Sequence, residues 1–301
     1  METNETESYL KAGEIAKEVK TFMKELVKKG MLLIDIAEGI EGKIRELGAE
    51  PAFPVNTSID EIAAHYTPLP GDEKVASGLL KIDVGICVDG FIADFAVSFD
   101  FSDDESHGKM FALNKGLLET AKKVVHPDMK VSEIGNSLGE FLEKFNIEND
   151  TRYSVVENLC GHTLGENKIH GGITIPNSKN DSNVELEEKA FAVEPFVTEG
   201  EGNVREGEGG GIYALSGEGA ARDRDVREIL TFIKESYKTR PFCARWLEKE
   251  GFKKIKFALS SLTRQGVLRH YPLLIGKSNM PISQFEDSFL IDEDRVLCFT
   301  C

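Results

Sequence analysis

Two aspartates, Asp83 and Asp94, have the spacing of side chains that meet on one face of a β-hairpin. Asp89 and Gly90 lie between them as a turn signal, and taking these as the two turn residues places Gly85 opposite Asp94. Asp83 is two residues from Gly85, so its side chain points to the same face as that of Asp94, with the Cα atoms roughly 7–8 Å apart. The opposite face of the predicted hairpin is apolar, as expected of a buried core.

Carboxylates this close in a partly dry site repel each other, and one of them normally takes up a proton. A divalent metal ion between the two removes the repulsion and gives the pair a function. The alternative is an exposed sheet face on which both aspartates are simply solvated. The hairpin alone leaves both interpretations open.

Three further polar residues lie in apolar surroundings: His162 in ENLCGHTLG, Glu194 in AFAVEPFV and Glu286 in ISQFEDSFLI. Acids buried in strands need partners. One imidazole and four carboxylates form a ligand set that suits paired ions such as Mn, Fe, Co or Zn. Two such ions, ~3.5–4 Å apart, polarise a carbonyl and stabilise the tetrahedral intermediate of hydrolysis.

Helical patterns occur twice along the chain, each time as a longer helix followed by a shorter one. Apolar residues at helical spacing predict helices over residues 9–29 and 33–47, and again over 109–125 and 132–145. The shorter helices correspond at a constant offset of 98 residues, which indicates two similar halves with helices leading into strands. The matched apolar residues are Met31 with Met129, Ile36 with Ile134, and Ile40 with Leu138.

Strand patterns cover residues 80–101, 174–176, 189–197 and 289–300, and a glycine-rich acidic loop is expected over 199–211. Three more helices are predicted over 225–237, 242–249 and 253–266, before a short strand at 268–274. This order predicts the α+β class. We expect one catalytic domain over residues 1–301, with a helical insert subdomain, winged-helix-like, over about 205–275.

Composition indicates a globular protein, with 41% hydrophobic and 29% charged residues. No run approaches the ~18 apolar residues that cross a bilayer, and the polar, acidic start does not have the pattern of a signal peptide. The five cysteines are odd in number and scattered, which argues against a disulfide framework and for a cytoplasmic location. Cys298 and Cys301 form a C-x-x-C pair but lack the second pair that a structural zinc site needs.

Charge is unevenly distributed along the chain. The net charge of −16 disfavours binding of nucleic acid or anionic membrane by the whole surface. Residues 222–275, however, contain 13 Lys or Arg against six Asp or Glu, a local excess of +7.

The motifs together resemble those of the methionine aminopeptidases. The matching segments are I-D-x-G…D-G-x-x-x-D with Asp83 and Asp94, G-H at His162, V-E-P at Glu194 and Q-F-E at Glu286. The resemblance implies the pita-bread fold, in which two pseudo-twofold-related halves surround a dinuclear metal centre. The long insert between Glu194 and Glu286 resembles that of the type II, archaeal form.

The resemblance also implies a role for each ligand. Asp83 would chelate one ion, Asp94 and Glu286 would bridge both ions, and His162 and Glu194 would complete the second. A water held at the metals would attack the methionine carbonyl, with Glu194 as the proton shuttle. Two divalent ions per chain are therefore expected, drawn from Co, Mn, Fe or Zn.

Two histidines match the further active-site histidines of the family, namely His65 in A-A-H-Y-T-P and His170 in I-H-G-G-I-T-I-P-N. They would stabilise the intermediate or the leaving amide. Phe53 in A-F-P, with Ile169 and Tyr271, would form the apolar pocket for the methionine side chain. Without the resemblance, each histidine would be interpreted as a surface or packing residue. Core packing would equally explain Phe53, Ile169 and Tyr271.

The function expected from the resemblance is removal of the initiator methionine from nascent polypeptides whose second residue is small, by a monomer that binds no membrane and no specific DNA. Prolidase and aminopeptidase P share the fold and metals, but those relatives carry an N-terminal domain before the first ligand, here residue 83. An inactive homologue acting as a binding protein is the second alternative, and the five filled ligand positions argue against it.

The basic segment 222–275 has two further interpretations. Three helices, a short strand and a positive charge are also the pattern of a winged-helix DNA reader. An inserted surface module with its own composition explains the charge more simply. The remaining hypothesis is a docking face for ribosomal RNA near the exit of the nascent chain, formed by Lys253, Lys254, Lys256, Arg264 and Arg269.

Overall fold

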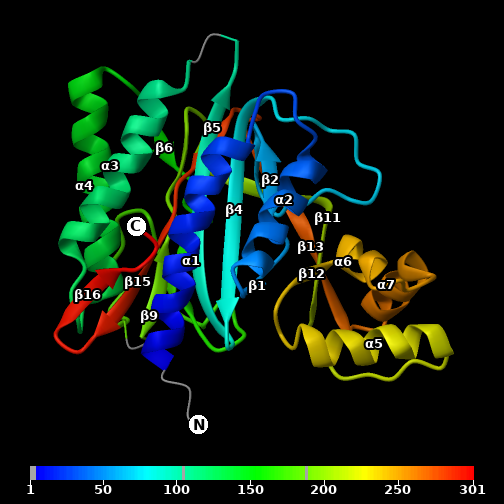
Figure 1. Cartoon of the computed structure of the whole chain (residues 1–301). Coiled ribbons are helices and arrows are strands. Elements are labelled where there is room, and N and C mark those ends of the chain that lie inside the picture. Colours follow the sequence, from blue (N-terminus) through cyan, green and yellow to red (C-terminus); the bar gives the residue numbers. More distant parts are fainter. Residues whose placement is uncertain (1–4, 104–105, 187–188) are drawn as a thin grey trace.

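Two helix pairs flank the sheets in the computed structural model, which describes residues 5–103, 106–186 and 189–301 (Figure 1). The first pair is α1 (Glu5–Leu26) and α2 (Leu33–Glu46), and the second is α3 (Gly108–Val124) and α4 (Val131–Asn149). Helix α4 begins 98 residues after α2, which is the predicted offset. Helix α1 packs on the strands β4 and β5, whereas α3 and α4 pack together at the other side of the molecule.

The central hairpin consists of β4 (Gly78–Val88) and β5 (Phe91–Phe101). Its turn is the predicted one, because Asp89 and Gly90 both have positive φ angles, of 51° and 94°. The register pairs Val88 with Phe91 and Gly85 with Asp94, as predicted. Strands β1 (Glu50–Pro51) and β2 (Asn56–Ile59) complete this sheet along β4.

The second half contains a five-stranded and a three-stranded sheet. The larger has the order β16 (Arg295–Cys298), β15 (Asp287–Asp292), β9 (Ala190–Val193), β7 (Gly161–Leu164), β8 (Thr174–Ile175). The smaller has the order β14 (Ile282–Gln284), β10 (Phe196–Thr198), β6 (Ser154–Val155). The apolar core of the second half includes Leu113, Ile134, Phe191 and Phe289. This core is separate from the one beneath the central hairpin.

Two predicted strands are broken in the structure. Residues 189–197 form β9 and β10, which belong to different sheets and are separated by Glu194 and Pro195. Proline has no backbone N–H to continue a ladder, so the break follows from Pro195. Residues 289–300 instead turn back at Glu293, which has a φ of 54°, and form the hairpin of β15 and β16. Alternating apolar residues did not reveal either break.

The glycine-rich segment 199–211 is not the predicted loop, because most of it lies in the long strand β11 (Val204–Leu215). This strand pairs with β13 (Leu268–Gly276) through two register shifts. Glycine is required by close approach: a Cβ on Gly210 would lie 1.8 Å from the carbonyl oxygen of His65, and one on Gly209 would overlap the ring of His270.

Residues 224–264 contain the three predicted helices, α5 (Arg224–Ser236), α6 (Ala244–Lys249) and α7 (Ile255–Arg264). They enclose an apolar cluster of their own, with Ile229, Ile233, Leu247 and Leu262 at its centre. The adjoining sheet has the order β12 (Phe242–Cys243), β11, β13, β3 (Ile62–Ala64), so it connects the helices to the first half. In Figure 1 the three helices lie together beside the rest of the molecule.

The cysteines differ from the sequence-based expectation, because Cys298 and Cys301 form a disulfide while Cys87, Cys160 and Cys243 are free. The odd count had argued only against a framework of several bridges. Among the described residues, no helix is both long enough and apolar enough to cross a membrane.

Candidate metal centre

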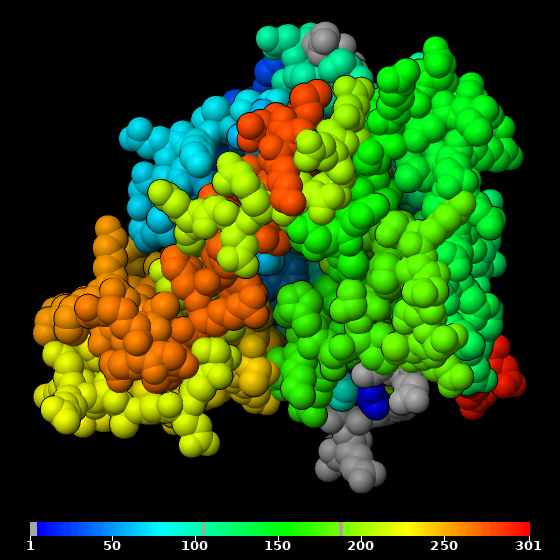
Figure 2. Space-filling view, turned by 180° about the vertical axis from the view of Figure 1, so that it is seen from behind, coloured from blue at the N-terminus to red at the C-terminus, as the bar shows by residue number. Residues whose placement is uncertain are grey.

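One cavity of about 490 Å³ is lined by all of the residues that the sequence pointed to. These are Asp83, Asp94, His162, Glu194, Glu286, His65, His170, Phe53, Ile169 and Tyr271. The cavity lies where the central hairpin, the second half and β13 meet. Figure 2 shows a hollow on this face, bordered by green residues of the second half and orange residues near β13.

The five candidate ligands come from different elements and converge at the base of the cavity. Asp83 and Asp94 lie on β4 and β5, and His162 lies on β7. Glu194 follows β9 at the break before Pro195, and Glu286 precedes β15 rather than lying within a strand. The His162 Nε2 atom is 3.8 Å from Asp94 Oδ2 and 3.7 Å from Glu194 Oε1. Asp94, His162 and Glu286 offer ligand atoms that all lie within 4.8 Å of one another.

The electrostatics of this cluster favour a bound cation. Burial raises the pKa of Asp83 to about 7. Burial, followed by repulsion from the neighbouring carboxylates, raises the pKa values of Asp94, Glu194 and Glu286 well above their usual range. Burial also lowers the pKa of His162 to about 3, so this imidazole is neutral and has a lone pair to donate.

Three carboxylate oxygens of the cluster have unsatisfied hydrogen-bonding capacity. Asp83 Oδ1, Asp94 Oδ1 and Glu286 Oε1 are buried and have no hydrogen-bond partner among the described residues. Buried polar atoms are normally satisfied, so three orphaned oxygens at one place need a common explanation. Four carboxylates and one neutral imidazole match the donor set of divalent ions such as Mn, Fe, Co and Zn, and the residues therefore fit such ions.

His65 and His170 lie beside this cluster without belonging to it. The His170 ring packs edge-on against His162, with ring centroids 4.6 Å apart. His65 packs edge-on against Tyr271 at 5.4 Å, and its Nδ1 atom is 3.1 Å from the carbonyl oxygen of Pro272. Desolvation lowers the pKa of His65 to about 4. His65 also has a φ of 69°, a backbone conformation that is uncommon outside glycine.

An apolar side of the cavity is formed by Phe53, Ile169 and Tyr271. Phe53 and Ile169 are only 6% and 9% exposed, so both also belong to the core beneath the hairpin. Gly85 makes this possible, because a Cβ there would lie 2.3 Å from the Phe53 ring. The glycine opposite Asp94 thus allows an aromatic side chain to lie next to the carboxylate cluster.

Comparison with known proteins agrees with this geometry. The model of metallopeptidase family M24 matches residues 7–227. A methionine aminopeptidase of Thermococcus onnurineus is 39% identical over 298 residues, which cover 97% of this chain and 98% of that protein. The chain belongs to the methionine aminopeptidases of family M24. It resembles the archaeal, type II-like members, and it binds divalent metal as a metallopeptidase.

Solved structures show the same fold at lower identity. A thermophilic Arx1 has a TM-score of 0.81 at 18% identity, covering 99% of this chain and 91% of that one. A methionine aminopeptidase of Thermotoga maritima has a TM-score of 0.68 at 19% identity, covering 100% of this chain and 98% of that one. These likenesses confirm the pita-bread fold.

Among the residues near this aminopeptidase's carboxylate cluster and cavity, Gln284 and Arg269 were not recognised as such by the sequence analysis. Gln284 Nε2 lies 3.3 Å from Asp83 Oδ2 and 3.4 Å from a carboxylate oxygen of both Glu194 and Glu286. Its position two residues before Glu286 was the signal, since alternate residues of an extended segment share a face. Arg269 was assigned to the basic docking face, but it lines the cavity, with its guanidinium 4.8 Å from the Tyr271 ring centroid.

We expect metal to stabilise this aminopeptidase more strongly as pH rises. Because folding raises the pKa values of these four carboxyls, they destabilise the metal-free fold least below the ordinary carboxyl pKa, and they destabilise it increasingly as pH rises through the raised values, about 7 for Asp83. Bound metal removes this repulsion and adds ~2.7 kcal/mol at a hundredfold excess over its Kd.

Melting curves of chelated and Mn²⁺-loaded protein between about pH 5 and pH 8 measure this difference. The gap in Tm should widen toward pH 8. A gap that stays constant or narrows would contradict the pKa shifts of these four carboxyls.

Proposed function

We propose that Asp83, Asp94, His162, Glu194 and Glu286 hold two divalent ions, with which the chain removes methionine from polypeptides that have a small second residue. The observation that carries this proposal is the convergence of two buried carboxylates, two partly buried carboxylates and a neutral histidine beside an apolar side of the cavity. When bound, the ions would polarise the scissile carbonyl and lower the pKa of water. We regard residues 1–301 as one catalytic domain, with 205–275 as its insert.

The remaining residues would position substrate and move protons. Glu194 Oε1 lies 3.7 Å from His162 Nε2 at the edge of the ligand cluster, so its carboxylate could take a proton from water and pass it to the leaving amine. His65 is neutral, and the Pro272 carbonyl can only accept, so Nδ1 carries the hydrogen. The Nε2 atom of His65 is then an acceptor, which suits an N–H group of the substrate.

A series of peptides tests the specificity. Phe53, Ile169 and Tyr271 form an apolar side of the cavity, which suits an unbranched methionine side chain. We expect peptides beginning Met-Gly or Met-Ala to be cleaved at least ~100-fold more efficiently, by kcat/KM, than one beginning Met-Leu. Equal cleavage of all three peptides would overturn the proposed restriction on the second residue.

Histidine variants should separate metal binding from turnover. His65→Ala and His170→Ala are expected to lower kcat roughly 100-fold while metal content stays unchanged, because neither side chain is assigned as a ligand. His162→Ala should lower metal content as well. Metal analysis and steady-state kinetics on the same preparations provide the measurement. Loss of metal from His170→Ala would show that the roles are wrongly divided.

We also propose that the exposed lysines of the insert contact ribosomal RNA, which would place the enzyme beside emerging chains. We further propose that the enzyme is a cytoplasmic monomer. Lys253, Lys254 and Lys256 are exposed, as predicted, which supports this idea. Lys254 is partly neutralised, since its Nζ lies 2.6 Å from Asp225 Oδ2. Arg269 is also exposed, but it lies at the cavity.

Co-sedimentation with ribosomes across a salt series tests the contact. Wild-type protein should bind at low salt and dissociate as salt rises, whereas the Lys→Glu triple variant at residues 253, 254 and 256 should not bind. Peptide hydrolysis should be equal in the two proteins. Equal association of both proteins would eliminate the lysine face as the contact.

A further inference from the structure

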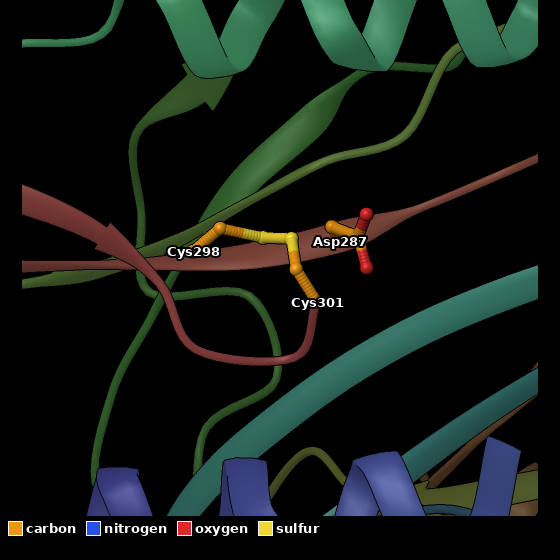
Figure 3. A group of neighbouring side chains, drawn as sticks. All are labelled: Asp287, Cys298 and Cys301. Atoms are coloured by element: carbon orange, nitrogen blue, oxygen red, sulfur yellow. A yellow bond between two sulfur atoms is a disulfide. The ribbon is translucent and has the colours of Figure 1, made fainter. Parts of the chain in front are cut away.

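The segment 298–301, which we term the clasp, packs against β15 at the back of the metal centre. Its two ends are joined by the disulfide between Cys298 and Cys301, whose Cα atoms are 5.6 Å apart, a usual separation for disulfides. Between the cysteines, Phe299 and Thr300 are almost fully buried. Figure 3 shows the disulfide next to β15, with the side chain of Asp287 alongside.

Three hydrogen bonds attach the clasp to two residues of β15, Asp287 and Ser288. The Phe299 N–H donates to the Ser288 carbonyl at 3.0 Å, and the Ser288 N–H donates to Thr300 Oγ1 at 2.9 Å. The Thr300 hydroxyl donates in turn to Asp287 Oδ1 at 3.0 Å. The Phe299 side chain packs edge-on against Tyr9 of α1, with ring centroids 5.9 Å apart. The clasp therefore fixes β15 from behind.

Strand β15 is linked directly to two of the proposed ligands. Glu286 immediately precedes Asp287 in the chain, so the position of β15 determines where its carboxylate lies. The Ser288 hydroxyl donates to the Asp94 carbonyl at 2.7 Å and accepts from the Asp94 N–H at 3.0 Å. A single residue of β15, Ser288, thus contacts both the clasp and the backbone of Asp94.

Asp287 is already committed to other partners, which argues against a metal ion at the cysteines. Lys20 Nζ donates to Asp287 Oδ1 at 2.5 Å and to the Thr300 carbonyl at 2.8 Å. Lys122 Nζ lies 3.3 Å from Asp287 Oδ2. Two cysteines and one aspartate whose oxygens already pair with two lysines make a poor donor set, so the pair is better suited to thiol–disulfide chemistry.

Accessibility favours reversible exchange. Cys301 is exposed and Cys298 is half-buried, so an external reagent can reach the outer sulfur first. The three free cysteines lie elsewhere, two of them buried and Cys160 lining the cavity. Thiol–disulfide exchange at Cys298 and Cys301 can therefore add or remove a covalent link between the two ends of the clasp.

We propose that Cys298 and Cys301 form a reversible redox site whose disulfide tightens the clasp and thereby positions Glu286 and Asp94 for metal binding; this rests on the ligand roles proposed above. In oxidation, the Cys301 thiolate attacks a small-molecule disulfide and releases one thiolate. The Cys298 thiolate then attacks the mixed disulfide and releases the second. The protein loses two electrons and two protons and gains one S–S bond, and the external disulfide becomes two thiols.

Reduction removes the covalent restraint on Phe299 and Thr300. Only noncovalent contacts, including their hydrogen bonds to β15, then keep the clasp on this strand. The clasp therefore opens more often, and Glu286 and Asp94 are positioned less firmly. Outer-shell contacts of this kind typically change metal affinity by ~10–100-fold, and since the clasp acts through β15 we expect the lower end of this range, about tenfold. In this scheme Thr300 and Ser288 are positioning residues.

The test compares Mn²⁺ binding by protein equilibrated with excess reduced or oxidised glutathione, using a competing chromophoric chelator. Mn²⁺ is used because thiols bind it poorly. Oxidised wild type should show two fewer free thiols than reduced wild type, a higher Tm without metal, and about tenfold tighter Mn²⁺ binding. Cys301→Ser should resemble reduced wild type in both conditions and should not respond to glutathione.

Thr300→Val separates the disulfide from its connection to β15. This variant should still lose two thiols on oxidation, but Mn²⁺ should bind as weakly as in reduced wild type in both conditions. Cys301→Ser also serves as the control for the other thiols, because a redox response that persists in it would arise at Cys87, Cys160, Cys243 or the unpaired Cys298, without the disulfide, and would overturn the proposal.

Three other results would also overturn it. They are equal Mn²⁺ affinity in the two redox states of the wild type, five free thiols after oxidation, and an extra bound metal ion that depends on Cys301. If Mn²⁺ does not bind at all, the proposed metal centre fails. The thiol count and the Tm of the metal-free protein still test the clasp, and an unchanged Tm would then reject it.

Discussion

Asp94→Asn is expected to lower kcat/KM for methionine release about a thousandfold and to reduce metal content. Asp94 is 3% exposed, and its ligand atom lies within 4.8 Å of those of His162 and Glu286. Little solvent therefore reaches this position to compensate for the lost charge. The same variant should raise the Tm of the metal-free protein, because it removes one of four mutually repelling carboxylates.

Asp89→Asn provides the matched control. Asp89 is exposed at the turn of the same hairpin, where its φ of 51° suits asparagine equally well. We expect this variant to retain activity, metal content and Tm. If Asp94→Asn kept wild-type turnover, the assignment of this carboxylate as a ligand would be wrong.

Arg245→Ala is expected to lower the free energy of unfolding by ~3–5 kcal/mol. Arg245 on α6 is 2% exposed and bonds both oxygens of Glu41 on α2, at 2.9 and 3.0 Å, while Glu41 is fully buried. The Trp246 indole N–H also donates to Glu41 at 2.8 Å. Without Arg245, the Glu41 carboxylate would stay buried with its charge uncompensated where the insert joins the first half.

Urea denaturation followed by tryptophan fluorescence measures this change, since Trp246 is the sole tryptophan of the chain and lies at the junction. Glu46→Ala is the control, because Glu46 forms an exposed pair with Lys43 and should change stability by less than ~1 kcal/mol. A loss below ~1 kcal/mol for Arg245→Ala would show that this buried pair does not stabilise the junction.

The shared face of Asp83 and Asp94 was predictable because its signals are local and periodic. The Asp89–Gly90 turn determines the register of the hairpin, and that register determines which face Asp83 and Asp94 share. The offset of 98 residues between α2 and α4 similarly reflects apolar stripes that each helix must bury. In both cases a short stretch of sequence contains the whole physical reason.

The errors arose where contacts distant in sequence decide the structure. Gly209 and Gly210 lie in a strand because His270 and His65 come close to them, which nothing near residue 209 reveals. Arg269 has the same composition signal as the surface lysines, but its place on β13 brings this exposed residue to the cavity. The disulfide depends on a hairpin at Glu293 that brings Cys298 and Cys301 onto β15, and the count of cysteines does not encode it.

The most direct test of the central claim is release of methionine from a Met-Gly peptide, measured in one preparation after chelation and again after Mn²⁺ is restored. We predict that release is lost with the metal, returns with it, and is not matched by peptides beginning with leucine or proline. Methionine release by the metal-free protein, or efficient release of leucine or proline by the loaded protein, would contradict the account.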